Sequence, residues 1–401
     1  MNIFKNKLVL ASPLIALAII FIFSLTLFPS VQPQPKNLPI AIVNEDEGVQ
    51  VPDQPKMNMG ETLVEKIQTM SSTNAGEEPA VKWVNVKNAE AVQKGLDNQE
   101  YYAALVIPKD FSAKQASLRT PDPIASEVQI YINQGMNTMA STAAGQILNG
   151  VVDNMNNAVR EQLLDGFEKQ KATLTPKQVQ NLVTPITKSV TNVNEIGTNS
   201  ANGNAPVSLF QPLWMASMAS AAIIYLAVSK LPVVSRKEKL TAKSLQILIG
   251  AVVALVVGFG LTWLADALIG FHIPDVSDTA LFLSLTSFSF YLMISAILSL
   301  IGIKGMPLFV LMLFFGAPLL AMAPEMMSSF YRDWFYSWLP MKFMVQGLRE
   351  LFYFGKGLSW NSAVSTLLWI GVGGMLVILA TAFKPHTVEK TAVQMENGQG
   401  A

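Results

Sequence analysis

The chain has 401 residues, of which 51% are hydrophobic and only 14% are charged, and its 28 basic residues balance 28 acidic ones. In soluble domains about a quarter of the residues are charged, so this composition indicates a membrane protein. The balanced charge gives no sign of nucleic-acid binding. The chain has no cysteine, two histidines and no G-x-x-x-x-G-K-[ST] motif, so we expect no cofactor, no metal site and no enzymatic activity.

The first long apolar run, residues 8–28, carries no charge and is long enough for one helical crossing of a bilayer. A cleaved signal peptide is the alternative interpretation. Because the run is long for a signal sequence and no small-x-small site follows it, we expect an uncleaved anchor. Five further apolar runs follow residue 206. They are residues 207–229, 245–269, 280–302, 306–323 and 361–383.

Basic residues predict the orientation of these six spans. The chain ends and the loops after the second and fourth spans hold 10 basic and 3 acidic residues, whereas residues 30–206 hold 14 basic and 19 acidic ones. Short loops that are rich in lysine and arginine lie on the cytoplasmic side of the membrane. We therefore predict a polytopic α-helical membrane protein in the cell membrane, with both termini cytoplasmic and residues 30–206 extracellular.

Four parts follow from this topology. Residues 1–29 form a cytoplasmic tip and the first span, and residues 30–206 form the extracellular domain. Residues 207–383 form a five-span membrane domain, and residues 384–401 form a cytoplasmic tail. An outside domain without cysteine does not rely on disulfides, which fits a Gram-positive bacterium.

The extracellular part shows a β-α-β-α-β-(α)-β pattern, which predicts a small α/β sandwich. Short apolar or alternating runs predict strands near residues 38–43, 81–86, 102–107 and 127–132. Residues 136–172 then show helical spacing, at Ala140, Ala143, Ile147, Val151 and onward to Phe167. A helix of about 50 Å exceeds a small sheet, so we expect a stalk or a partner for a second long helix. Residues 173–206 are rich in Thr, Asn and Gly and are interpreted as a linker.

Residues 44–48 place three carboxylates, from Glu45, Asp46 and Glu47, on one turn. Hard cations such as Ca²⁺ bind clustered carboxylates, but the spacing is not that of an EF-hand, so a solvated acidic turn is the preferred interpretation. Asp266 is the clear acid within the apolar runs. Its position close to the end of its run favours a wet interfacial place over a buried functional one.

Several segments resemble, in their order along the chain, those of the YhgE/Pip (phage infection protein) family. These are residues 41–48 (AIVNEDEG), 101–112 (YYAALVIPKDFS), 130–137 (IYINQGMN) and 338–350 (WLPMKFMVQGLRE). The membrane half of that family is grouped with permeases of the second type of ABC exporter. Two features depart from the family pattern: Phe343 replaces the usual tyrosine, and the outside domain is short because it lacks the long helical insertions of many members.

The resemblance implies that the loop at 230–243 docks on an ATPase subunit. The residues that would do so are Arg236, Lys237 and Lys239. The alternative is that these charges only set the topology and contact anionic lipid. Both interpretations stay open at this stage.

Residues 324–360 are too charged to cross a bilayer and too aromatic for an ordinary loop, which favours amphipathic helices in the outer leaflet. The resemblance to the exporters implies re-entrant helices at this place. An aromatic anchoring belt is the alternative. The residues singled out here are Glu325, Arg332, Asp333, Trp334, Trp338, Pro340, Arg349 and Glu350.

Two functions fit these features. The first is the permease subunit of an ABC-type exporter, with a separate ATPase, membrane lipid and a second identical or related subunit as partners. Its substrate would be lipophilic or amphiphilic. The second is a cell-surface receptor, or an accessory component of a secretion system, without transport activity. Six spans exceed what the display of one domain requires, so we favour the permease.

Overall fold

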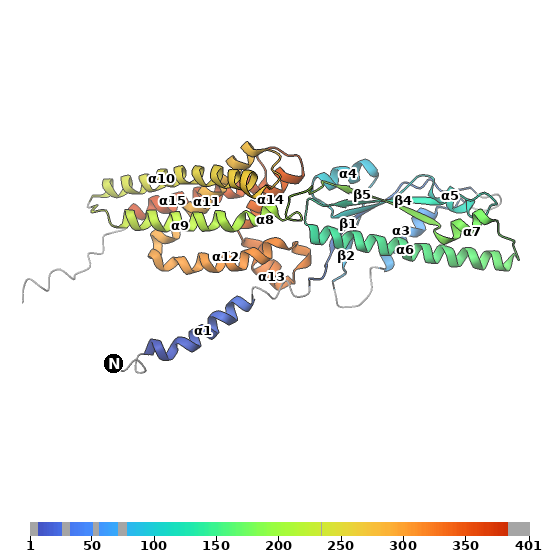
Figure 1. Ribbon diagram of the computed structural model, residues 1–401, viewed down its shortest axis with the longest axis horizontal. Helices are drawn as coiled ribbons and strands as arrows, with labels where there is room; N and C mark the ends of the chain where they lie inside the picture. Colours follow the sequence, from blue (N-terminus) through green and yellow to red (C-terminus); the bar gives the residue numbers. More distant parts are fainter. Residues whose placement is uncertain (1–6, 26–32, 51–55, 71–77, 234, 384–401) are drawn as a thin grey trace, which may run out of the picture.

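The computed structural model describes residues 7–25, 33–50, 56–70, 78–233 and 235–383. An α/β half lies at one end of an elongated molecule and a helical half at the other (Figure 1). The predicted cytoplasmic tail lies outside the described residues. Helix α1 (Lys7–Leu25) covers the first apolar run and diverges from the helical half, with Lys7 at the end of the molecule that is remote from the α/β half.

The α/β half is built on one five-stranded mixed sheet of order β2-β1-β3-β4-β5. β1 is parallel to β2 and β3, β3 is antiparallel to β4, and β4 is parallel to β5. The strands are β1 (Leu38–Asn44), β2 (Val81–Asn85), β3 (Ala103–Ile107), β4 (Ser126–Asn133) and β5 (Ile186–Val193). The first four match the predicted strands. The linker interpretation of residues 173–206 is wrong, because this stretch contains β5 and helix α7 (Pro176–Val183).

The polar sequence of β5 follows from its place at the edge of the sheet. Of its eight residues only Ile186 is buried, and the four exposed positions are Lys188, Val190, Thr191 and Asn192. An edge strand pairs on one side and is partly solvated, so it lacks the apolar run that marks a central strand. By contrast, all five residues of the central strand β3 are buried.

Helices cover both faces of the sheet, so alternate residues of β1 serve two cores. Ile40 and Ile42 face the core that includes α3 (Met59–Met70), α5 (Phe111–Ser117) and α6 (Thr138–Lys169). Ala41 and Val43 face the smaller core under α4 (Ala89–Asp97). This two-sided burial explains the near-continuous apolar run of β1.

Helix α6 confirms the predicted long helix, but neither predicted role for its length is right. Its buried stripe steps by four residues through Ala140, Ala144, Leu148 and Val152, which lie on the sheet. Ala143, Ile147 and Val151, which were expected on that stripe, are only partly buried. Beyond the sheet the helix packs on α7 and the segment after α5 rather than forming a stalk or pairing with a second long helix. This distal core consists of Leu118, Leu163, Phe167 and Leu182.

The helical half is arranged around α11, which contacts α9, α10, α14 and α15. Its helices are α8 (Ala205–Ser208), α9 (Phe210–Ser229), α10 (Arg236–Trp263), α11 (Val276–Ile301), α12 (Met306–Ala321), α13 (Ser329–Trp334), α14 (Met341–Tyr353) and α15 (Ser362–Ala380). A π-helical turn, Leu264–Ile269, extends α10 and holds the exposed Asp266, whose interfacial position stays a prediction.

Within the described residues, four continuous helical segments are long and apolar enough to cross a membrane. They are Ala205–Ser229, Arg236–Ile269, Val276–Ala321 and Ser362–Phe383. The third segment contains both α11 and α12, which are joined by the 3₁₀ turn Gly302–Gly305. The helices therefore coincide with all six expected apolar runs, while the number of crossings and their sidedness stay predictions.

Close contact between α10 and α11 depends on two glycines. A Cβ atom on Gly250 would lie 1.9 Å from the Tyr291 ring, and one on Gly258 would lie 2.1 Å from Ser284 Oγ. The opposite side of α10 exposes large apolar residues, among them Leu248, Val252 and Val256. The helix thus packs tightly on its central neighbour and presents an apolar face outward, as expected for a helix in contact with lipid.

Candidate functional site

The α/β half is fixed to the helical half by hydrogen bonds across one junction. The main-chain N–H of Lys36 donates to the carbonyl oxygen of Glu325 at 2.8 Å, and the Tyr102 hydroxyl donates to Glu325 Oε2 at 2.8 Å. Asn137 Nδ2 donates to the carbonyl oxygen of Ala321 at 3.0 Å. Because Lys36, Tyr102 and Asn137 lie just before β1, β3 and α6, the orientation of the sheet is set at this junction.

Glu325 belongs to the segment that runs from the end of α12 to α14, which is the segment singled out in the sequence. This segment forms the 3₁₀ turn Pro324–Met326, helix α13, the 3₁₀ turn Tyr336–Trp338 and then α14, which starts directly after the buried Pro340. Trp334 and Trp338 are exposed, and Arg332 pairs with Asp333 at 2.9 Å. Exposed tryptophans between an apolar bundle and a polar domain are typical of the membrane interface.

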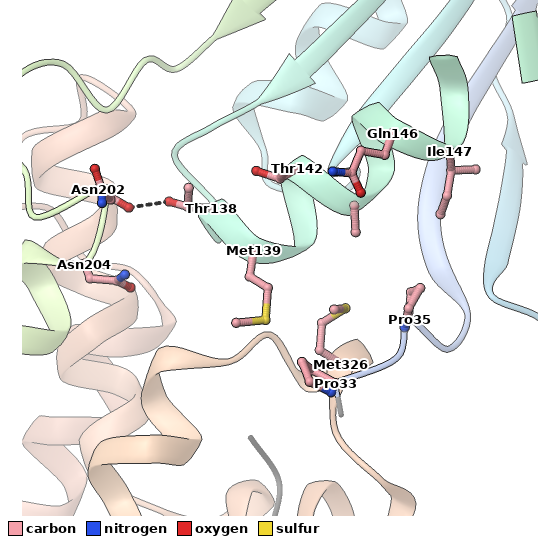
Figure 2. Close-up of a pocket in the computed structure, with 11 residues that line it drawn as sticks. Pro33, Pro35, Thr138, Met139, Thr142, Gln146, Ile147, Asn202, Asn204 and Met326 are labelled. Carbon is pink, nitrogen blue, oxygen red and sulfur yellow. Dashed lines mark hydrogen bonds between the residues drawn. The ribbon is translucent and has the colours of Figure 1, made fainter. Parts of the chain in front are cut away.

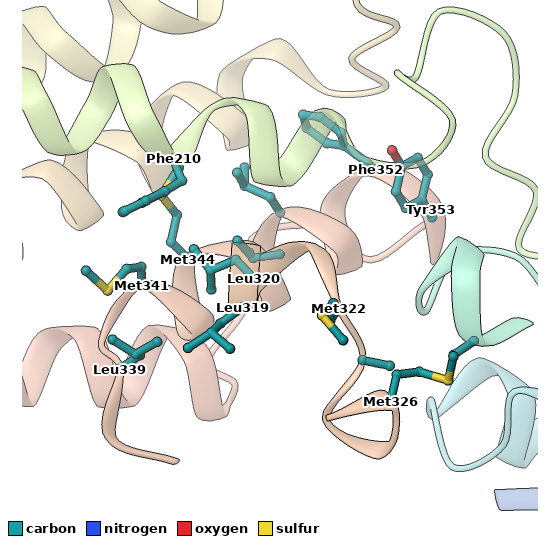
Figure 3. Close-up of a cluster of buried hydrophobic side chains, with 14 of the residues drawn as sticks. Phe210, Leu319, Leu320, Met322, Met326, Leu339, Met341, Met344, Phe352 and Tyr353 are labelled. Carbon is teal, nitrogen blue, oxygen red and sulfur yellow. The ribbon is translucent and has the colours of Figure 1, made fainter. Parts of the chain in front are cut away.

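Helix α14 is anchored by an apolar cluster beneath the junction (Figure 3). Met341 and Met344 of α14 lie with Phe210 of α9 and with Leu319 and Leu320 of α12. All five side chains are buried. This packing holds the polar residues of α14 in place where the two halves meet.

A polar cavity of about 390 Å³ opens at the junction beside α14. Its lining comes from both halves of the molecule. Asn98, Gln99, Tyr102 and Met136 contribute from the α/β half, and Tyr336, Lys342, Val345, Gln346, Arg349, Glu350, Lys356 and Ser362 contribute from the helical half. The structure therefore brings together Arg349 and Glu350, which the sequence singled out, with residues more than 200 positions away.

Arg349 is the most unusual group in this cavity. Its Nε and Nη2 atoms are buried and have no hydrogen-bond partner among the described residues. Burial lowers the pKa of the guanidinium, while Tyr336, Tyr102 and Tyr353 act in the opposite direction. An arginine remains charged in proteins even so. Arg349 as a whole is half-buried, so the cavity contains a guanidinium whose Nε–Nη2 edge is buried and lacks a paired carboxylate.

The carboxylates near Arg349 are engaged with other donors. Glu350 is buried, and its Oε2 accepts a hydrogen bond from Asn361 Nδ2 at 2.9 Å. Glu325 accepts from Tyr102, as described above. Burial, followed by the charge of Glu325, raises the pKa of the Tyr102 hydroxyl well above its ordinary value, so this hydroxyl stays a donor.

A second, larger hollow of about 780 Å³ lies on another side of the junction (Figure 2). Pro33 and Pro35 of the chain entering the α/β half, Met139 and Ile147 of α6, and Met326 supply most of its apolar surface. Thr138 Oγ1 donates to the carbonyl oxygen of Asn202 at 2.7 Å on one wall. This groove is apolar where the Arg349 cavity is polar.

The basic residues singled out near residue 236 lie at the other end of the helical half (Figure 1). Ser235 Oγ accepts a hydrogen bond from the N–H of Glu238, and Glu238 Oε2 accepts one from the N–H of Ser235, both at 3.1 Å. These two bonds form a capping box at the start of α10. Arg236 and Lys237 are exposed and Lys239 is half-buried on the first turns. From this end the 28 residues of α10 extend about 42 Å towards the junction.

The acidic turn at residues 44–48 proves to be structural. Asp46 is buried, and its carboxylate accepts from the N–H groups of Gly48, Gly60 and Ser112 at 3.2, 3.0 and 2.9 Å, and also from the Ser112 hydroxyl. Glu45 Oε1 accepts from the N–H of Ala89 at the start of α4. The preferred solvated turn is therefore wrong for Asp46, and the described residues hold no cluster of acidic or histidine side chains suited to a metal.

Sequence reasoning missed most of the groups that surround Arg349. Tyr102, Tyr336, Lys342, Tyr353 and Lys356 were not singled out, although the first four lie within or beside the family-like segments. An aromatic anchoring belt was the alternative interpretation of residues 324–360, and it stays a prediction for the exposed Trp334 and Trp338. Tyr102 and Tyr336 instead line the cavity that contains Arg349.

Comparison with known proteins identifies the family. Residues 8–383 match the family described as ABC-2 family transporter protein. The chain belongs to this family. Its members are the membrane components of transporters, lack a nucleotide-binding motif and normally work with a separate ATPase subunit. An ABC-2 membrane half agrees with the resemblance drawn from the sequence.

Two individual proteins are also similar to this ABC-2 family chain. Over 135 residues it is 24% identical to the uncharacterized protein YhgE of Bacillus subtilis (strain 168), which confirms the YhgE/Pip resemblance. The match covers 33% of this chain and 16% of YhgE, about a sixth of that protein's length. A solved domain assigned to an ABC type-2 transporter of Thermotoga maritima MSB8 is 18% identical, with 38% of this chain and 86% of the domain covered and a TM-score of 0.26.

Proposed function

We propose that the chain is the membrane subunit of an ABC-type exporter whose ATPase is a separate polypeptide. The observation that carries this proposal is α10, one continuous helix with an exposed basic end and with its other end close to the junction. The absence of a phosphate-binding motif from the sequence agrees with an ATPase supplied in trans. Family membership supports the same assignment.

In this proposal, Arg236, Lys237 and Lys239 contact the ATPase, and α10 transmits its movement. The doubly capped start makes the helix end well defined rather than frayed. The close contacts at Gly250 and Gly258 make α11 follow a displacement of α10. Because α11 also contacts α14, such a displacement reaches the junction through packed helices.

The proposed sidedness has both termini in the cytoplasm and the α/β half outside. Lys7, the basic start of α10 and the exposed Lys304 of the α11–α12 turn lie towards the end remote from the sheet (Figure 1). Exposed Trp334 and Trp338 lie at the opposite end of the helices. Basic residues on one side and an aromatic belt on the other support this orientation.

The groove and the polar cavity support a lipophilic or amphiphilic substrate. Both lie where the helical half meets the α/β half, which is the outer leaflet in the proposed orientation. One is apolar and the other polar, and these are the two environments that an amphiphile requires. We propose further that two subunits, identical or related, pair in the membrane to form the transport path.

Replacement of Arg236, Lys237 and Lys239 together by Gln tests the assignment. The expected result is loss of ATPase co-purification and of stimulated ATP hydrolysis, while the protein still reaches the membrane because Lys230 and Lys243 hold its orientation. The matched control changes the exposed Lys82, Lys87 and Lys94 of the α/β half to Gln, which removes the same charge and should leave ATPase association unchanged.

Orientation is checked in the same strains, because the chain has no cysteine. A cysteine at the exposed Asn85 should react with an impermeant maleimide on intact cells, and one at the exposed Leu231 should not. Normal ATPase association in the triple Gln variant would contradict the coupling role. If wild-type protein associates with no ATPase at all, the receptor or secretion-accessory function replaces the exporter.

A further inference from the structure

One edge of a guanidinium, buried without a hydrogen-bond partner in the half-buried Arg349, is the strongest unexplained feature of the described part of the molecule. Two of the guanidinium nitrogens of Arg349, Nε and Nη2, have no hydrogen-bond partner among the described residues. Both are on the same edge of the planar guanidinium group. Burying a charge is costly unless an opposite charge and hydrogen bonds compensate it. A protein retains such an arrangement most readily when a ligand supplies the missing anion.

We propose that the polar cavity at the junction binds a phosphate group, with Arg349 as its main ligand. Nε and Nη2 of an arginine match two oxygens of a phosphate in a bidentate geometry. Lys342 and Lys356 also line the cavity and add two further positive charges. Against these three cations stands one lining carboxylate, that of Glu350, which already accepts from Asn361.

A tyrosine on the same helix carries a second buried group without a partner. Tyr353 lies one helical turn after Arg349 on α14, and its buried hydroxyl likewise has no hydrogen-bond partner among the described residues. The spacing of four residues places the two side chains on the same face of α14. Three of the buried atoms that lack a hydrogen-bond partner among the described residues therefore belong to Arg349 and Tyr353, on neighbouring turns of α14. Their grouping indicates one missing hydrogen-bond acceptor.

The surroundings favour a lipid headgroup as the source of the phosphate. The cavity, about 390 Å³, has room for a glycerol group beside the phosphate. The neighbouring 3₁₀ turn exposes Trp338 at 53% and α13 exposes Trp334 at 72%, as expected at the depth of headgroups. The inference goes beyond the exporter proposal and does not depend on an ATPase, because binding is measured on this chain alone.

The experiment uses the full-length protein in a phosphate-free maltoside detergent and buffer. Three probes are titrated: dihexanoyl phosphatidylglycerol below its micelle concentration, glycerol phosphate, and dihexanoylglycerol as the uncharged control. Calorimetry gives Kd, and thermal unfolding gives the shift in Tm at saturation. We expect the phosphatidylglycerol to bind and to raise Tm, glycerol phosphate to bind more weakly, and dihexanoylglycerol to show no saturable binding.

Arg349→Gln should raise the Kd for the phosphatidylglycerol by about tenfold or more, because it removes both the charge and the bidentate fork. Arg349→Lys should fall between wild type and Arg349→Gln. The matched control is Arg332→Gln at the same junction, where Asp333 and Glu78 already pair with the guanidinium, and there the Kd should not change. If Arg349→Gln does not accumulate, the double variant Lys342→Gln and Lys356→Gln replaces it, with several-fold weaker binding expected.

The outcomes separate the sources of phosphate. Binding of the phosphatidylglycerol much more tightly than glycerol phosphate identifies a lipid headgroup site, and equal binding of the two identifies a site for a soluble phosphate ester. The proposal is overturned if wild-type protein binds neither phosphate probe. It is equally overturned if the Arg349 variant, or the double lysine variant in its place, binds them with wild-type affinity.

Discussion

The α/β half and the helical half treat their buried polar groups differently. In the α/β half, Asp46 accepts four hydrogen bonds, and Asn156 both donates to the carbonyl and accepts from the N–H of Ile186, at 2.9 and 2.7 Å. Among the described residues, every buried side-chain atom without a hydrogen-bond partner lies in the helical half. These atoms are Gln246 Nε2, Thr279 Oγ1, Ser295 Oγ, Arg349 Nε, Arg349 Nη2 and the Tyr353 hydroxyl.

This difference indicates which half moves. A fully bonded polar network specifies a single arrangement, because any displacement leaves buried donors unpaired. Helices whose buried polar groups are unpaired in one arrangement lose less when they shift to another. The α/β half is therefore suited to act as a rigid body, and the changes that accompany transport are expected within the helical half and at its ligands.

The largest effect is expected from the loss of the Asp46 carboxylate. Asp46→Ala leaves the N–H groups of Gly60 and Ser112 buried without an acceptor, so we expect a loss of about 3–5 kcal/mol in the stability of the α/β half. Hydrogen exchange of the β1 and β3 peptides in the full-length protein measures this loss. Asp46→Asn should lose less, and Glu47→Ala, at an exposed neighbour, should change it by less than about 0.5 kcal/mol.

Glycine pairs test the packing of the helical half. A Cβ on Gly258 would lie 2.4 Å from the main-chain nitrogen of Ser284, so Gly258→Ala must push α10 away from α11 at a cost of about 1–3 kcal/mol. Two residues further on, a Cβ on Gly260 meets nothing within 4 Å, so Gly260→Ala should cost nothing. Thermal unfolding in detergent compares the two. Equal Tm values would show that the α10–α11 contact is loose.

Removal of a single hydroxyl should act in opposite directions in the two halves. The Ser141 hydroxyl donates to the carbonyl oxygen of Asn133, so Ser141→Ala should lose about 1 kcal/mol. The buried Thr279 hydroxyl has no partner among the described residues, so Thr279→Val, which keeps the shape, should lose nothing or gain up to about 1 kcal/mol. A clear loss in Thr279→Val, measured by thermal unfolding, would remove the contrast between the halves.

A similarly small effect at neutral pH is expected at the junction itself. Tyr102→Phe removes the hydrogen bond to Glu325 and should cost about 1 kcal/mol. Because the folded-state pKa of Tyr102 is raised, its stabilisation is fully present below about pH 10 and is lost as the pH rises through the raised value. The free energy of unfolding should therefore fall less steeply between pH 7 and pH 11 in Tyr102→Phe than in wild type. Parallel curves would contradict this linkage.

The sequence predicted the elements whose signal is local. Long apolar runs coincide with helices, and central strands such as β3 are apolar throughout because both of their faces are buried. Strand β5 was missed because an edge strand needs few apolar residues. The excess length of α6 was recognised, but its packing on α7 was not, since α7 lay in a stretch interpreted as a linker.

The candidate site was only partly predictable, because its contacts join distant residues. Arg349 and Glu350 were singled out by charge within an apolar context, yet the Tyr102–Glu325 bond spans 223 positions. The burial of Asp46 likewise depends on Ser112, which is 66 positions away. Nothing in the local pattern distinguishes a buried carboxylate that accepts main-chain N–H groups from one in a solvated turn.

The α6–α7 turn has a consequence for how such chains diversify. It lies at the tip of the molecule farthest from the helical half, while both passages of the chain between the halves lie at the junction (Figure 1). An insertion into this turn would extend the domain outward without moving either passage, and a longer loop adds little closure entropy. Relatives of very different length can therefore keep the same junction and vary only how far this domain extends from the helical half.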